Sequence, residues 1–202
     1  MTAPLYLYAV VAPRPRAALG RGIHRRPLEV LRIGRAYVVL ERGRAPEPTA
    51  SRVVAHDRVV RRIARAASAV LPLRFASTAT DEAAVRALFA PLAAQLERAL
   101  ERVRGAVQFT LRVRGRPARA PVLRGGPGTR WLAARHTVPE IDPLTDATRP
   151  FVRASRVERK VRDGELATVY HLVPRPDVDA WTHAVSRART SLRRAHASSA
   201  NA

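Results

Sequence analysis

Histidine is the residue type in this chain best suited to hold a metal ion or to move a proton near neutral pH. The six histidines stand at positions 24, 56, 136, 171, 183 and 196, and none forms the four-residue pair with a glutamate that builds a helical zinc site. His56 and Asp57 are adjacent, but neighbouring helix residues point about 100° apart and would not face one substrate. His56 also continues an apolar stripe, so we expect it at the edge of a core. The chain has no cysteine, which excludes disulfides and thiolate metal sites.

The sequence offers little support for a phosphate-binding loop or for a serine nucleophile. Gly125–Thr129 could cradle a phosphate with its backbone amides, but it lacks the lysine and the strand-to-helix setting of a phosphate loop, so a turn is the better interpretation. No Gly-x-Ser-x-Gly nucleophile elbow occurs. We therefore predict a protein that is not an enzyme, with no catalytic residue, no cofactor, no metal and no small-molecule substrate.

Arginine dominates the charge of the chain. The formal net charge is +21, and it is spread evenly, with 18 basic and 8 acidic residues in 1–103 and 19 and 8 in 104–202. Lys160 is the single lysine, a skew that the codon bias of a GC-rich genome explains without any binding role. The densest basic stretch runs from Arg102 to Arg135 without an acidic residue, and an acidic partner would dock there on Arg112, Arg114, Arg116, Arg119 and Arg124.

A nucleic-acid-binding module that uses this Arg102–Arg135 stretch is the alternative function. Such binding would weaken steeply with added salt, because bound cations release counterions from the phosphates. Aromatic residues make up 5% of the chain, which leaves few side chains for a platform that stacks bases.

The segment Val53–Val113 carries the clearest succession of predicted elements. Apolar residues at three- and four-residue steps predict a helix from Val53 to Val70, and the run Val70–Phe75 predicts a buried strand. A second helix follows from Asp81 to Val103, with Thr80 as N-cap and a kink or break at Pro91. Alternation of apolar and polar residues then predicts a strand over Val107–Val113.

Arg74 interrupts the predicted strand between Leu73 and Phe75. Alternation would send Arg74 to the face opposite its neighbours. There its guanidinium would pair with a nearby carboxylate such as Asp81, or bind an acidic partner.

Turn residues mark the remaining predicted elements. They comprise a strand Leu5–Val11, a hairpin of Leu28–Ile33 and Ala36–Glu41, a Gly- and Pro-rich loop Gly115–Gly128, a hairpin of Ser155–Arg162 and Glu165–Val173, and a helix from Val178 to Leu192 with Trp181 in its apolar stripe. The mixture predicts an α+β protein in which helices cover antiparallel sheets. The apolar run Ala3–Pro13 is far shorter than the roughly 20 residues of a membrane span, so we expect a cytosolic protein.

Several of these motifs together resemble a known family. The Val-Leu-Pro-Leu-Arg-Phe run at 70–75 with its flanking helices, the strand Leu5–Val11, Gly128–Leu132, and Thr168–Val173 followed by the Trp181 helix are similar to the gas vesicle accessory proteins GvpF and GvpL. The chain departs from the family at Ala76, where glycine is usual, and it lacks the usual Gly- and Pro-rich aromatic ending.

The resemblance implies a function and a domain plan. It implies an accessory protein that binds the hydrophobic shell protein during vesicle nucleation or growth, in the cytoplasm with other gas vesicle proteins and without catalysis. Candidate partner-binding residues are Leu71, Leu73, Arg74, Phe75 and Trp181. We predict two small domains, 1–104 and 105–195, the second ferredoxin-like and possibly incomplete, with a Gly/Pro/Arg-rich loop at 114–130 and a disordered tail at 196–202.

Overall fold

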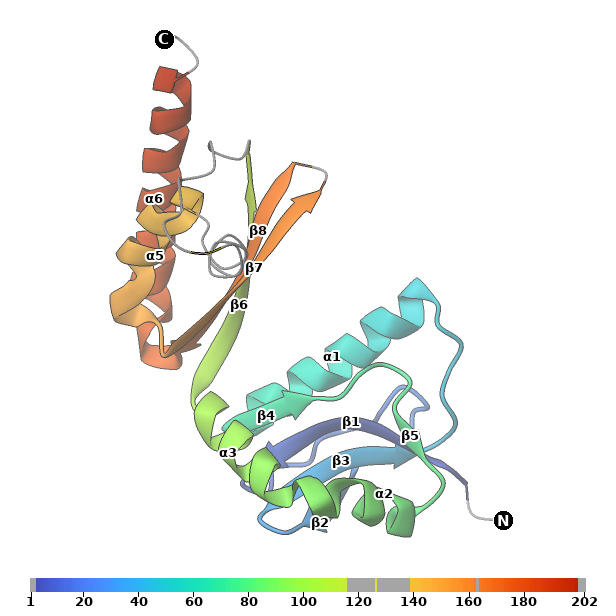
Figure 1. Cartoon of the computed structure of the whole chain (residues 1–202). Helices are drawn as coiled ribbons and strands as arrows, with labels where there is room; N and C mark the ends of the chain where they lie inside the picture. Colours follow the sequence, from blue (N-terminus) through green and yellow to red (C-terminus); the bar gives the residue numbers. More distant parts are fainter. Residues whose placement is uncertain (1–2, 116–125, 127–138, 163, 200–202) are drawn as a thin grey trace. The chain divides into compact units, whose positions relative to one another are not determined.

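A computed structural model gives the fold, and it describes residues 3–115, 126, 139–162 and 164–199. The chain divides into two compact units, Met1–Gly105 and Ala106–Ala202 (Figure 1). Each unit contains one antiparallel sheet with helices packed against it. The predicted α+β class is therefore confirmed.

The first unit is built on a five-stranded antiparallel sheet in the order β2-β3-β1-β4, with β5 also paired to β1. The central strand is β1, and all eight of its residues are buried. The strands are β1 (Leu5–Ala12), β2 (Glu29–Ile33), β3 (Ala36–Arg42), β4 (Ala69–Pro72) and β5 (Thr78–Ala79). The predicted first strand and the predicted hairpin at Gly34 are confirmed, and Gly34 turns the hairpin with a φ of +58°.

One extra residue in β1 decides which side chains face which side of this sheet. The pairing of β1 with β3 changes register between Leu7 and Ala9, so Tyr8 is inserted as a β-bulge. As a consequence Tyr6, Tyr8 and Ala9 all join the core on one face, whereas Leu7 and Val10 join the core on the other. Strict alternation would have separated Tyr8 from Ala9.

Helices cover both faces of the first sheet. Helix α1 (Ala50–Ala66) packs on the face that carries the tyrosines, and α2 (Glu82–Phe89) and α3 (Ala93–Val103) pack on the opposite face (Figure 1). The buried helix residues are Val59, Val60 and Ile63 on the first face and Val85, Phe89 and Leu100 on the second. Because both faces are covered, the sheet has no broad solvent-facing side.

The second predicted helix is broken where the proline predicted a break. The short 3-10 turn η1 (Ala90–Leu92) separates α2 from α3, and it contains Pro91. The predicted N-cap Thr80 is wrong, because the carboxylate of Asp81 accepts the Ala84 N–H at 2.8 Å and takes the cap position itself. A carboxylate at this place also meets the positive end of the helix dipole.

Strand β4 ends at Pro72, so the predicted strand Val70–Phe75 is wrong over its last three residues. Beyond Pro72 the chain turns, and Ala76 adopts a φ of +67° in the left-handed region. The carbonyl of Leu73 and the N–H of Ala76 bond to the side chains of His56 in α1 and Tyr6 in β1, and not to the backbone of a neighbouring strand. As a result Arg74 lies exposed in a turn.

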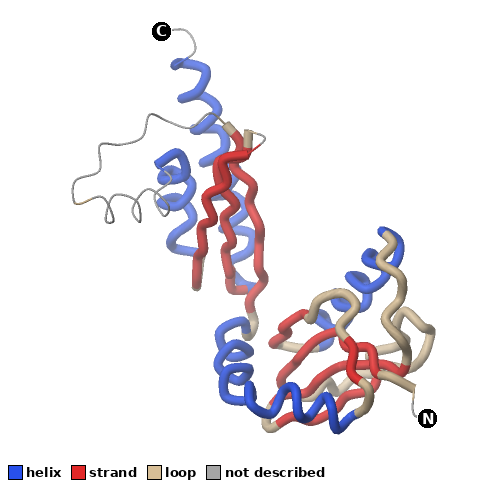
Figure 2. The backbone as a smooth tube through the Cα atoms, turned by 45° about the vertical axis from the view of Figure 1, so that its right-hand side comes forward, coloured by secondary structure: helices blue, strands red, loops and turns tan. Residues whose placement is uncertain are grey.

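The second unit contains a three-stranded antiparallel sheet in the order β6-β8-β7. Its elements are β6 (Ala106–Arg114), η2 (Pro139–Ile141), α5 (Asp142–Thr148), η3 (Arg149–Phe151), β7 (Ala154–Arg162), β8 (Glu165–Pro174), η4 (Arg175–Asp177) and α6 (Val178–Ser199). Helices α5 and α6 lie side by side on one face of the sheet (Figure 2). There Ile141 packs against Ala167 and Val169 of β8.

The β7–β8 hairpin is confirmed at the predicted place, and Gly164 turns it with a φ of +72°. The described elements follow one another as strand, helix, strand, strand, helix, which is part of the order of a ferredoxin-like domain. The ferredoxin-like assignment itself stays a prediction. Helix α6 runs to Ser199, beyond residue 195 where the predicted second domain ends.

Several predictions concern positions that lie outside the described residues. These are the phosphate-loop alternative at Gly125–Thr129 apart from Gly126, the Gly128–Leu132 motif, most of the 114–130 loop, Arg116, Arg119, Arg124 and residues 200–202. Among the helices that the structure describes, none has the length and apolar character needed to cross a bilayer.

Candidate functional site

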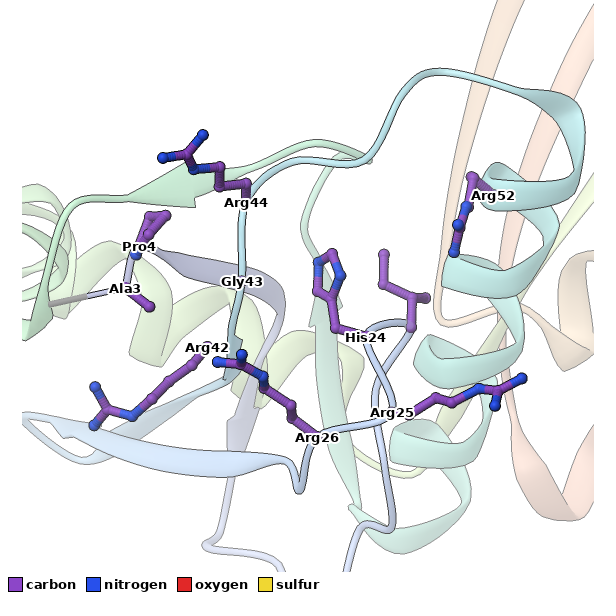
Figure 3. A pocket seen from close by; sticks show the side chains of 10 residues that line it. Ala3, Pro4, His24, Arg25, Arg26, Arg42, Gly43, Arg44 and Arg52 are labelled. Carbon is purple, nitrogen blue, oxygen red and sulfur yellow. The ribbon is translucent and has the colours of Figure 1, made fainter.

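Arginines from three separate segments line one open groove in the first unit, which we call the arginine groove. Figure 3 shows the 24–26 segment, the segment after β3 and the first turn of α1 around it. Its cationic lining residues are Arg25, Arg26, Arg42, Arg44 and Arg52, and its volume is about 800 Å³. Ala3, Pro4, Ile23, His24 and Gly43 complete the lining. Among the residues that the structure describes, no aspartate or glutamate lines the groove, so its lining carries only cationic charged side chains.

A buried polar network beneath the groove holds the 24–26 segment in place. Tyr8 donates its hydroxyl proton to Glu41 Oε1, and it accepts the backbone N–H of Ile23 at 2.8 Å. The same carboxylate oxygen accepts the N–H of His24 at 3.2 Å. Burial, reinforced by the Glu41 carboxyl, raises the pKa of Tyr8, so its hydroxyl keeps the proton that it donates. The network therefore ties the loop backbone to β1 and β3.

Two glycines are required where this loop meets the sheet. A methyl group on Gly22 would lie 2.3 Å from the carboxyl atoms of Glu41, and one on Gly43 would lie 2.4 Å from the ring of His24. Real side chains essentially never approach so closely. Arg62 of α1 holds the same loop from outside, because its Nε donates to the carbonyl of Leu19 at 2.8 Å.

A second buried chain of hydrogen bonds links β1, α1 and the turn after β4. The N–H of Ala76 donates to the Tyr6 hydroxyl at 3.2 Å, and that hydroxyl lies 2.9 Å from His56 Nδ1. His56 Nε2 lies 3.3 Å from the carbonyl of Leu73, which only accepts, so Nε2 carries the imidazole proton and Tyr6 donates to Nδ1. Burial lowers the pKa of His56 and raises that of Tyr6, and both are neutral at pH 7.

The aromatic rings of this region pack as one cluster. Tyr6 meets Tyr8, His24, His56 and Phe75 edge to face at centroid distances of 5.0 to 6.4 Å. Tyr8 stacks on His56 at 5.3 Å. The Leu-Arg-Phe motif therefore positions Phe75 as a structural anchor, and His56 lies inside the core, 6% exposed, and not at its edge as predicted.

In the second unit the side chain of Trp181 joins α6 to the sheet. Trp181 is 4% exposed, and its indole N–H donates to His171 Nδ1 at 3.1 Å. The indole also stacks on Phe109 of β6 at 4.2 Å. Burial lowers the pKa of His171, which leaves it neutral and able to accept this bond.

The structure brings only some of the predicted partner-binding residues together. Leu71 and Leu73 are half-buried against the core under α2 and α3, while Arg74 is exposed nearby. Asp81 was predicted as a possible partner of Arg74, but it caps α2. The roles of these residues, of Phe75 and of Trp181 in partner binding stay predictions, as does the acidic-partner patch.

Of that patch the structure describes Arg112 and Arg114, which are exposed on β6. They lie on the polar face of this sheet. On the same face Tyr170 donates to Glu158 at 3.2 Å, and Arg156 pairs with Glu158 at 3.0 Å. Within residues 102–115, Arg104 already pairs with Glu101 at 2.9 Å. The acid-free sequence run is thus partly neutralised by residues just outside it.

The arginine groove was missed at the sequence level. Its arginines are separated by up to 27 positions, and no local sequence pattern links them. No cluster of three or more metal-binding side chains occurs in the part of the chain that the structure describes. The hydroxyls of Tyr6 and Tyr8, the ring of His56 and Glu41 Oε1 bond to one another and to backbone, so their geometry supports a structural role.

Comparison with known proteins gives a consistent result. The sequence model of the gas vesicle synthesis protein GvpL/GvpF family matches residues 4–137. The crystal structure of the gas vesicle protein GvpF from Anabaena sp. PCC7120 is similar in fold, with a TM-score of 0.73 and 15% identity over 94% of this chain and 88% of that chain.

GvpF from Microcystis aeruginosa is similar to the same degree, with a TM-score of 0.74 and 16% identity over 94% of this chain and 91% of that one. At these identities the structural likeness shows a shared fold. No curated protein gives a significant match.

Proposed function

Because this chain belongs to the gas vesicle GvpL/GvpF family, we propose that it binds the hydrophobic shell protein while vesicles nucleate or grow, and that it does no chemistry itself. Membership of the family gives it an accessory role in gas vesicle formation and an association with gas vesicle proteins. Shell-protein binding is the specific step that we add, in the cytoplasm where vesicles form.

Exposed apolar side chains are the observation that carries this proposal. Leu88 at the end of α2 is 54% exposed, and Leu92 in η1 is 42% exposed. Residues four apart in helical backbone lie on the same side, so the two leucines offer one apolar contact. Val53 and Val54 of α1 are the other large apolar residues that are exposed in the described part of the chain. A partner that is itself apolar would gain by covering Leu88 and Leu92, which lie close together, and these two leucines are the contact that we propose.

The edge of the first sheet offers a second contact of the kind predicted from the sequence. Among the strands that the structure describes, β4 pairs only with β1, so its other side could accept a further strand. Leu71, Leu73, Arg74 and Phe75 lie at or just beyond this edge, and they remain proposed partner-binding residues. Trp181 is covered, so a partner would meet α6 through the exposed residues around it.

Co-expression with the shell protein tests the proposal. A tagged full-length chain should retain the shell protein through nuclease treatment and moderate salt. Replacing Leu88 and Leu92 together by glutamine should reduce retention severalfold, because glutamine keeps the helix but removes the apolar contact. The matched control replaces Val53 and Val54 by glutamine, which changes equally exposed residues on α1.

Three outcomes separate the alternatives. Retention lost only in the leucine variant supports binding through α2 and η1. Equal loss in both variants would place the contact elsewhere or make it unspecific. Capture of nucleic acid with no shell protein would favour the alternative, a nucleic-acid-binding module that uses the Arg102–Arg135 stretch.

A further inference from the structure

The arginine groove is a concentration of uncompensated charge. Arg42 pairs with Glu29 at 3.3 Å across β2 and β3. For Arg25, Arg26, Arg44 and Arg52 the described part of the chain provides no carboxylate partner, and all four are exposed. Elsewhere in this unit, exposed arginines such as Arg61 and Arg104 pair with acidic neighbours one helical turn away. The groove therefore gathers four exposed arginines without a described carboxylate partner in one place, where a negative partner could contact several of them.

The groove is also held in shape before any partner arrives. The backbone N–H groups of Ile23 and His24 donate to Tyr8 and Glu41, which fixes the start of the 24–26 segment. Gly22 packs directly on the Glu41 carboxyl group. The turn closes through a bond from Gly22 N to the carbonyl of Arg26 at 2.9 Å, and Arg25 within it adopts a φ of +60°. A backbone that is fixed before binding loses less conformational entropy when the partner binds.

We propose that the arginine groove binds an acidic polypeptide segment, meaning a run of aspartate or glutamate side chains on a partner protein. Guanidinium groups hold carboxylates through paired, charge-assisted hydrogen bonds, and five arginines line this one groove of about 800 Å³. No phenylalanine, tyrosine or tryptophan lines the groove, so it offers no stacking platform for the bases of a nucleic acid. The site uses neither Leu88 nor Leu92, so binding there can be tested separately from the shell-protein contact.

Fluorescence anisotropy with the purified full-length protein tests this site. The probe is a labelled oligoglutamate peptide, and the test variant carries Arg26→Gln, Arg44→Gln and Arg52→Gln. The control variant carries Arg14→Gln, Arg16→Gln and Arg58→Gln, which removes the same charge from exposed positions outside the groove. All six side chains are exposed, so both variants should fold, and circular dichroism checks that they do.

The proposal expects saturable binding that the test variant weakens by about tenfold and the control variant by less than about twofold, since each exposed ion pair contributes only modestly to affinity and three are removed together. Equal weakening in both variants would overturn it, because the peptide would then respond only to net charge. Absence of saturable binding would overturn it too. So would an oligothymidylate of equal charge that binds more tightly and loses its affinity in the same test variant.

Discussion

Replacing Ala76 by glycine should stabilise the first unit. Ala76 has a φ of +67°, a conformation that costs an L-residue about 1 to 2 kcal/mol relative to glycine. The greater freedom of glycine in the unfolded chain offsets about 0.4 to 1 kcal/mol of this gain. The alanine methyl is exposed, so little packing is lost, and the N–H that donates to Tyr6 at 3.2 Å remains. The net expectation is an increase of about 0.5 to 1 kcal/mol in the free energy of unfolding.

The assay must report on the correct unit. Both tryptophans, Trp131 and Trp181, belong to the second unit, so their fluorescence would not follow unfolding of the first. Urea denaturation followed by circular dichroism, with hydrogen exchange of β1 amides, reports on the first unit. As the control, Ala90→Gly replaces an exposed alanine with a φ of −57° and should destabilise by about 1 kcal/mol. A loss of stability in Ala76→Gly similar to that of the control would refute the left-handed assignment.

Three further predictions concern the buried polar groups. Tyr8→Phe should lower the free energy of unfolding by about 1 to 3 kcal/mol, because Glu41 and a loop amide lose their partner, and urea titration measures the loss. Trp181→Phe should cost the second unit a similar amount by leaving His171 without its donor, and an unchanged unfolding curve would contradict that bond. Burial lowers the pKa of His56 and His171 below the ordinary 6.5, so the unfolded chain binds more protons than the folded chain as the pH falls. The free energy of unfolding should therefore be at its full value above about pH 6.5 and decrease as the pH drops to about 5. A urea midpoint that rises on acidification would contradict this prediction.

The sequence predicted the elements whose signal is local. Pro91 marks the break between two helices, and Gly34 and Gly164 mark two hairpins. All three predictions are confirmed. The predicted strand was wrong where side chains distant in the sequence form hydrogen bonds with the backbone. The turn after Pro72 is held by His56 and Tyr6, which lie 17 to 70 residues away, and no local pattern shows this.

The candidate site was harder to predict than the fold. The bulge at Tyr8 places Ala9 on the same face as Tyr8, and a single sequence gives no sign of one inserted residue. The arginine groove depends on a contact distant in sequence, because the Tyr8 hydroxyl accepts the N–H of Ile23 in the loop that carries Arg25 and Arg26. Charge spread evenly along the sequence therefore becomes concentrated only after folding.

The central claim is that this chain binds the apolar shell subunit and does not act on it chemically. Light scattering during dilution of denatured shell protein into buffer, with increasing amounts of the chain, tests this claim most directly. The account predicts that aggregation falls in proportion to the amount of chain added. No reduction of scattering, or complete suppression by trace amounts of the chain, would contradict it.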